Sequence, residues 1–238
     1  MIILQDGRVG RRRTLSGDAV AVALPLIAAV FGMAALVAVP DHAPSQAGRI
    51  LMIIGMTLVM MSPFAVPLAR AVGRATLWWH APAAVAVALL VFLGTWSLAA
   101  AGMHLVGETL ALAITPAGAM ALLATCCIVS QIGHGRLRLI AACQVTQPIY
   151  QDQHVRGAAR WSGLAATRCI RACAVPMTLA AVQPSLAGIT AVAVLLWVER
   201  FAGRPQLRLP LALGYLTIGV AALAVMGLVQ PSRHLGHH

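Results

Sequence analysis

Seven apolar runs dominate the sequence, and each is close to the length that a bilayer requires. A hydrocarbon core about 30 Å thick needs roughly 20 helical residues. Segments that cross lipid as single runs fold as helices, because their backbone groups must bond within the segment. The expected spans are approximately 19–39, 50–68, 81–101, 110–132, 163–182, 185–201 and 209–229. The sequence therefore predicts an all-α, polytopic membrane helix bundle of about seven transmembrane helices.

The composition excludes an ordinary soluble domain. Of the 238 residues, 60% are hydrophobic and only 10% are charged, which is typical of a polytopic membrane protein. The net charge of +11 comes from arginine alone, because the chain contains no lysine. These arginines lie in short tracts between the apolar runs, so they indicate membrane topology. The expected partner is a lipid bilayer and not a nucleic acid.

Counting arginines by loop tests the orientation of the bundle, because short cytoplasmic loops are enriched in positive charge. With the N-terminus inside, the inner segments hold 13 arginines and the outer segments hold two, while Arg168 and Arg171 fall near the inner end of the fifth span. Seven helices with the C-terminus outside fit this rule, whereas six helices place the last basic loop on the wrong side. Since Arg168, Arg171, Gln183 and Pro184 interrupt the fifth and sixth runs, a re-entrant or tilted pair stays open there.

This orientation divides the chain into three parts. A basic cytoplasmic segment covers residues 1–18, the transmembrane bundle covers 19–229, and a short outer tail with histidines covers 230–238. The first apolar run is longer than the roughly 7–15 residues of a cleaved secretion signal. We therefore expect an uncleaved membrane anchor at the start of the bundle.

Three sulfur-bearing residues follow one another at intervals of four in the fifth span: Cys169, Cys173 and Met177. Residues four apart stand one above the other on a helix, so this spacing predicts a sulfur stripe on one face. Thiolate and thioether sulfurs are the ligands that a soft ion such as Cu(I) prefers. The alternative is structural, because cysteine also packs as a small hydrophobe between helices.

The second span carries a similar stripe of methionines. Met52, Met56 and Met60 share one helix face, and Met61 lies beside it. A Cu(I) site needs ligands from more than one element, so Met60 or Met61 is the natural complement to the cysteines of the fifth span. Methionines on one face are, however, also common as adaptable core packing, and this second interpretation stays open.

Harder ligands are expected on the outer side of the membrane. His104 and Glu108 are spaced for one helix face, and His42 lies in the first outer loop beside Asp41. Imidazole and carboxylate groups suit Cu(II), Zn or Fe, so His42, His104 and Glu108 form a second candidate metal set. The terminal histidines His234, His237 and His238 are expected either to join this outer set or to form a solvated tail.

Acidic residues are scarce, since the chain has six in total. Glu199 stands next to Arg200 at the inner end of the sixth span, where an interfacial ion pair is the expected role. No Ser-His-Asp order, nucleotide-binding glycine loop or paired carboxylates occur, so there is little for general acid–base catalysis. The sequence therefore names no catalytic residue and favours a protein that is not an enzyme.

Several short stretches resemble, in their order along the chain, a family of bacterial integral membrane proteins (DUF2182) that is described as predicted metal-binding. They are VMMSP at 59–63, QVTQPI at 144–149, the cysteine-rich segment of the fifth span, and VER at 198–200. The chain departs from the family pattern after QVTQPI, where Tyr150, His154 and Arg156 replace a lysine and cysteines. The resemblance implies a multi-pass protein of the bacterial inner (cytoplasmic) membrane that binds a metal.

The leading hypothesis from the sequence is a membrane protein that binds or handles a transition metal, most plausibly copper, through Cys169, Cys173, Met177 and Met60 or Met61. A second hypothesis is a non-catalytic structural or accessory subunit of a larger membrane complex, or a homo-oligomer, in which the sulfurs only pack. A third is a transporter of an organic or anionic solute that uses Arg168 and Arg171 as buried charge.

Overall fold

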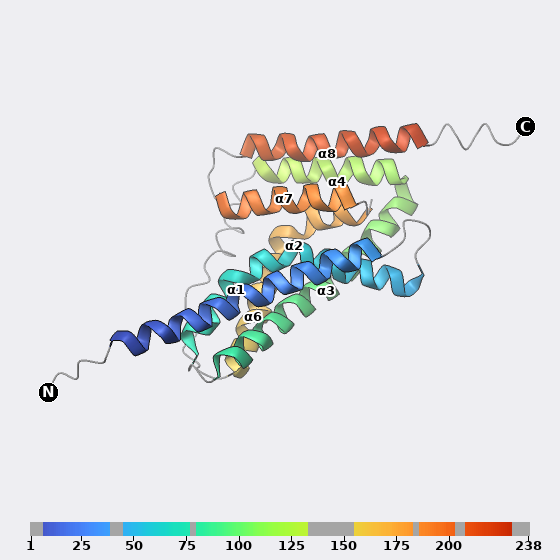
Figure 1. Cartoon of the computed structure of the whole chain (residues 1–238). Helices are drawn as coiled ribbons and strands as arrows, with labels where there is room; N and C mark the ends of the chain where they lie inside the picture. The colour runs from blue at the N-terminus through green and yellow to red at the C-terminus, as the bar shows by residue number, and fades with distance from the viewer. Residues whose placement is uncertain are drawn as a thin grey trace, which may run out of the picture. The chain divides into compact units, whose positions relative to one another are not determined.

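The computed structural model describes residues 7–38, 45–76, 80–132, 155–182, 186–202 and 208–229. The regular structure of these residues is helical throughout, which confirms the all-α prediction (Figure 1). The seven described helices are α1 (Gly7–Ala38), α2 (Gln46–Ala75), α3 (Ala81–Ile114), α4 (Pro116–Ile132), α6 (Val155–Val182), α7 (Leu186–Ala202) and α8 (Arg208–Val229).

Among the described residues, four of these helices are long and apolar enough to cross a membrane. They are α2, α3 and α6 over their full lengths, and the Ala19–Ala38 portion of α1. The apolar parts of α4 and α8, Pro116–Gln131 and Arg208–Ala224, are shorter. Such helices indicate a membrane protein in contact with lipid.

Several helices extend past the apolar runs that predicted them. Helix α1 begins at Gly7, although the first span was expected to begin at residue 19, and α2 continues to Ala75 past the expected end at 68. Arginine, a good helix former, occurs four times in residues 7–18 of α1, and residues 69–75 of α2 are mostly alanine and arginine. Hydropathy therefore located the membrane-like portion of each helix but not the helix ends.

The boundary between α3 and α4 lies at Thr115, whereas the loop was expected between residues 101 and 110. Thr115 has a φ of 79°, which is unusual for a β-branched residue. Its hydroxyl accepts a hydrogen bond from the backbone N–H of Gly118 at 3.2 Å, so it caps the start of α4. Pro116 occupies the first helical position, where its missing N–H has no cost.

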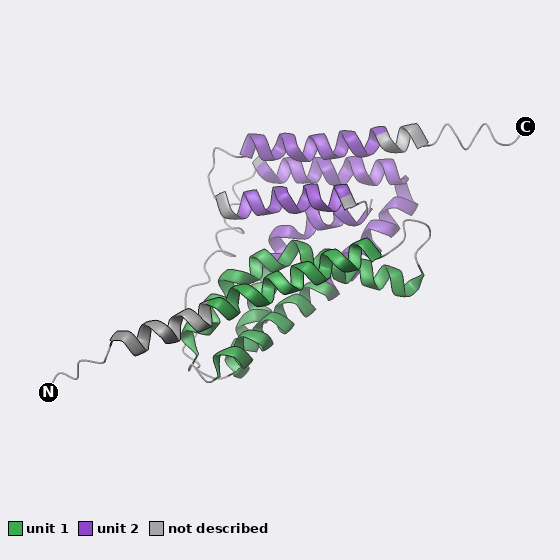
Figure 2. Cartoon of the chain, viewed as in Figure 1, with its two compact units in different colours: residues 1–97, 144–168 green, residues 98–143, 169–238 purple. Residues whose placement is uncertain are grey.

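The chain divides into two compact units, and the division falls within α3 and α6 (Figure 2). Unit 1 contains Met1–Ser97 and Gln144–Arg168, and unit 2 contains Leu98–Cys143 and Cys169–His238. Unit 1 thus holds α1, α2 and the first parts of α3 and α6. Unit 2 holds the remaining parts of α3 and α6 together with α4, α7 and α8.

Helices α1 and α2 of unit 1 pack through two facing glycines. A Cβ placed on Gly32 would lie 2.8 Å from the carbonyl oxygen of Gly55, and one placed on Gly55 would lie 2.9 Å from the carbonyl oxygen of Gly32. Neither position has room for a side chain, so the two backbones meet directly, as small residues allow in membrane helices.

The outward faces of α1 and α3 in unit 1 are strongly apolar. Val30 and Phe31 of α1 are 69% and 67% exposed, and Leu90 of α3 is 72% exposed. Large apolar side chains directed away from the core are expected where the surrounding medium is lipid. This surface supports contact with a bilayer.

Unit 2 is built around an apolar cluster between α4, α6 and α8. Its buried members are Met120, Leu123, Ala124, Cys127, Leu179 and Tyr215. A Cβ on Gly219 of α8 would lie 2.9 Å from the Cβ of Ala124 on α4, so these two helices approach closely, and Figure 1 shows them running in opposite directions. Helix α7 packs on α8 where Gly214 meets Leu195.

Candidate functional site

The three sulfur-bearing residues of α6 share one buried face of the helix. Cys169, Cys173 and Met177 are 5%, 7% and 0% exposed. Because α6 is continuous over Val155–Val182, their four-residue spacing stacks them along its axis. The predicted sulfur stripe is therefore present as a structural feature, and all three members lie in unit 2.

The surroundings of this stripe are apolar. Ala172, Leu179 and Ala180 of the same helix are buried, and Leu179 belongs to the cluster that also contains Cys127 of α4. Cys126, by contrast, is exposed. All four of these described cysteines are thiols and not disulfides, whereas Cys143 lies outside the described residues.

The two methionines expected to complete the site lie in α2. Met60 and Met61 are both fully buried, at 0% exposure. They belong to unit 1, while the sulfur stripe of α6 belongs to unit 2. Their participation in a common site with the cysteines stays a prediction.

The outer candidate set is described only in part. His104 and Glu108 lie one turn apart on α3, and the His104 Nε2 atom is 3.4 Å from the Glu108 Oε1 atom. The His104 side chain is 13% exposed and that of Glu108 is 43% exposed, so the pair lies at the surface of unit 2. His42, like the terminal histidines, lies outside the described residues.

Glu199 and Arg200 occupy the last turn of α7. Glu199 is buried, at 8% exposure, and Arg200 is half-buried. Consecutive residues of a helix point in different directions, so their expected ion pair stays a prediction.

Within the described ranges, no group of three or more histidine, cysteine, aspartate or glutamate side chains is placed to hold a metal ion. A soft ion of low coordination number, such as Cu(I), needs fewer protein ligands, and these can be sulfur atoms of cysteine and methionine. Two thiols and one thioether on a buried helix face are a donor set suited to Cu(I) and poorly suited to Mg²⁺ or Ca²⁺. The chemistry of the stripe thus fits the expected ion.

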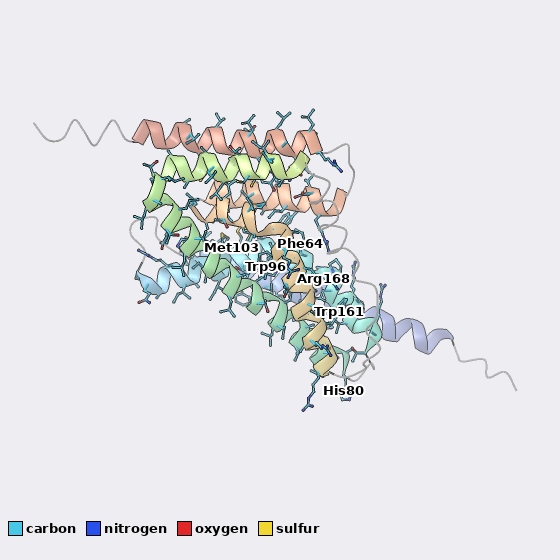
Figure 3. All side chains as sticks on the ribbon, turned by 180° about the vertical axis from the view of Figure 1, so that it is seen from behind. Phe64, His80, Trp96, Met103, Trp161 and Arg168 are labelled. Atoms are coloured by element: carbon cyan, nitrogen blue, oxygen red, sulfur yellow. The ribbon has the colours of Figure 1, made fainter. Side chains whose placement is uncertain are left out.

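The arginines of α6 do not match the buried charge that the transporter hypothesis requires. Arg168 and Arg171 are both exposed. Figure 3 shows Arg168 further along α6 than Trp161. Charge that binds a solute within a membrane protein is expected to face the bundle interior or a water-filled cavity, so the exposure of both arginines counts against the transporter hypothesis.

Sequence reasoning missed three buried polar groups in unit 1. The Ser62 Oγ, Trp96 Nε1 and Ser162 Oγ atoms have no hydrogen-bond partner among the described residues. The buried threonines differ, because Thr57 and Thr178 donate to the carbonyl oxygens of Ile53 and Ala174, each at 2.9 Å. The available signal was a polar side chain inside an expected span, as with Ser62 in 50–68 and Trp96 in 81–101, whereas Ser162 precedes the expected fifth span and gave no such signal.

No family model, curated protein or solved structure matches this chain. The function is therefore inferred from the residues themselves. The family resemblance drawn from VMMSP and the cysteine-rich segment stays a prediction, and the QVTQPI stretch lies outside the described residues.

Proposed function

We propose that this chain is a multi-pass membrane protein that handles a soft transition metal, most plausibly copper as Cu(I). The observation that carries the proposal is the shared buried face of Cys169, Cys173 and Met177 on α6. Sulfur donors select Cu(I) over harder ions. A stripe of donors along a helix axis also offers successive positions for one ion, as a transfer path requires.

In this proposal the two thiols are the primary ligands and bind as thiolates, so metal binding releases protons. Met177 supplies a thioether, and Met60 or Met61 supplies another. His104 and Glu108, with His42, capture or release the ion at the outer surface. The protein crosses the bacterial inner membrane seven times with its N-terminus inside, an orientation supported by the arginine distribution.

The test is elemental analysis of the full chain, purified in detergent without a metal-binding tag and loaded under reducing conditions with Cu(I) held by a competing chelator. The Cys169→Ser/Cys173→Ser variant removes both primary ligands. The Cys126→Ser/Cys127→Ser variant is the matched control, because it removes one exposed and one buried thiol from another helix.

Near-stoichiometric copper in the wild type and the control, lost in the α6 variant, is the expected result. Equal copper in all three proteins, or none in any, would overturn the proposal. Equal loss of copper in both variants would show that copper binds the cysteines of this chain without preference for α6, and it would also count against the proposal.

A structural role in a larger membrane complex is the second candidate. It is favoured by Cys127, which is 0% exposed and packs among Met120, Leu123 and Leu179. This cysteine shows that a thiol of this chain can act as a packing group. Native mass measurement in mild detergent separates the two candidates, since a defined heteromeric complex without copper supports the structural role.

A further inference from the structure

The outward face of α6 differs from those of α1 and α3 in unit 1. On α1 and α3 this surface carries Val30, Phe31 and Leu90. On the first part of α6 it carries three exposed arginines: Arg156, Arg160 and Arg168. A helix that meets the composition of a membrane span thus presents charge where its neighbours present hydrocarbon.

These three arginines form one continuous surface, which we call the arginine face. At 3.6 residues per turn they fall within an arc of about 120° around the helix and extend over about 18 Å of its length. Leu164, 52% exposed, and the exposed Thr167 lie on the same face. The opposite side of this segment buries only small residues, namely Ala158, Ser162 and Ala166, all 0% exposed.

The near end of the arginine face coincides with one end of unit 1. Val91 of α3 lies 3.9 Å from a Cβ placed on Gly163 of α6, so these segments are neighbours. Figure 3 shows His80 at the end where both helices begin, with Trp161 and then Arg168 successively further along α6. Basic and tryptophan side chains are typical of the membrane–water interface, and this end is therefore an interface.

Arg168 lies about 12 Å beyond Arg160 along the helix axis, toward the hydrocarbon. An exposed arginine at that depth is costly without an anionic partner. Side chains on a helix lean toward its N-terminus, which here is the interfacial end. Arg168 therefore extends back toward the interface, on the same face of α6 as Arg160.

Among the side chains described in unit 1 there is no carboxylate that could pair with these arginines. The partner must be an anion, and it must lie at the membrane interface. A lipid phosphate meets both conditions, because guanidinium groups bind phosphate oxygens through paired N–H donors and because lipid phosphates lie at the interface.

We propose that the arginine face is a binding site for the phosphate of an anionic phospholipid in the leaflet at this end of unit 1. Arg160 and Arg168 contact the phosphate, Arg156 adds positive charge nearer the aqueous side, and the exposed Leu164 contacts the acyl chains. This site is independent of the proposed copper binding, since none of its residues belongs to the sulfur stripe.

The experiment uses the full chain, stripped of lipid in mild detergent and titrated with phosphatidylglycerol or phosphatidylcholine while bound lipid is counted by native mass spectrometry. The Arg160→Gln/Arg168→Gln variant disrupts the site. The Arg70→Gln/Arg74→Gln variant is the control, because it removes the same charge from exposed positions of α2, in the part that leads to His80. We expect phosphatidylglycerol affinity to fall about tenfold or more in the α6 variant only.

An equal loss in the two variants would reduce the effect to general attraction between a basic protein and anionic lipid, and it would overturn a specific site. Equal affinity of the wild type for both lipids would overturn it as well. A photo-crosslinker at position 164, used in native membranes, gives an independent readout. Adducts of phospholipid mass support the proposal. Adducts with a second polypeptide would overturn it, because they would show that a protein and not a lipid contacts the arginine face.

Discussion

The two halves of α6 share one continuous helix but have opposite surroundings. In residues 155–168 burial is confined to a narrow stripe of small side chains, and the remaining surface includes three exposed arginines. In residues 169–182 nearly every side chain is buried or half-buried, and Arg171 is the exposed exception. A helix that is apolar on one side lies at a surface, and one that is apolar all round lies in a core. Residues 155–168 of α6 follow the first pattern, and residues 169–182 follow the second.

This difference assigns different chemistry to the two halves. The first half is accessible to the surrounding medium, so its charges can bind lipid phosphate. The second half is closed to that medium, so its thiols can only bind what reaches the core of unit 2. The proposed lipid and copper sites therefore depend on different environments along the same helix.

Introducing an arginine into each half of α6 should give the largest difference in stability between the two halves. Ala180→Arg buries an unpaired charge at a position that is 3% exposed, and we expect the folded state to lose about 4 kcal/mol or more. Leu164→Arg adds the same side chain to the arginine face and should cost less than about 1 kcal/mol. Monodisperse yield on size-exclusion chromatography and a thermal melt in detergent measure both. Equal tolerance would show that residues 169–182 are not a closed core.

Enlarging the narrow stripe of the first half should have the next largest effect. Ala158→Leu and Ala166→Leu each force a large side chain into a position that is 0% exposed, and overpacking of this kind costs about 1–3 kcal/mol. Thr167→Leu, on the exposed side of the same helix, is the control and should change stability by less than about 0.5 kcal/mol. If all three variants melt like the wild type, the stripe does not pack closely in unit 1.

Much of this contrast was visible in the sequence, because it depends on spacing within one helix. Four-residue intervals correctly placed Cys169, Cys173 and Met177 on one face. The run of helices also followed from hydropathy, and the α3–α4 boundary was missed since hydropathy does not register a cap such as Thr115. Whether Met60 or Met61 joins the cysteines depends on how different helices meet. Spacing along one helix does not determine that.

Burial could not be deduced from residue type either. The transporter hypothesis requires Arg168 and Arg171 to be buried, yet both are exposed. Nothing in the sequence marks Trp96 as buried, although it is 0% exposed with its indole N–H unpartnered among the described residues. Burial is decided by neighbouring helices, and sequence periodicity indicates only which residues are buried or exposed together.

Replacing one thiol in each environment should give a smaller effect on stability. Cys173→Ser puts a hydroxyl at a position that is 7% exposed. We expect a cost of about 1 kcal/mol, because a serine in a helix can donate to the carbonyl four residues earlier, as Thr178 does to Ala174. Cys126→Ser at an exposed position of α4 should cost almost nothing. Thermal melts of the two metal-free variants compare their stability, and a larger loss for Cys126→Ser would contradict the burial of Cys173 and the exposure of Cys126.

Neutralising the arginine face should have the smallest effect on the lipid-free protein. Arg160 and Arg168 are exposed, and unit 1 offers them no described carboxylate. Arg160→Gln/Arg168→Gln in detergent alone should therefore change the unfolding free energy by less than about 0.5 kcal/mol. The same variant should lose the stabilisation that added phosphatidylglycerol gives the wild type, because a ligand that binds only the folded state raises its stability. A loss above about 1 kcal/mol without lipid would mean that these arginines hold contacts within the chain, and the first half of α6 would then resemble the second.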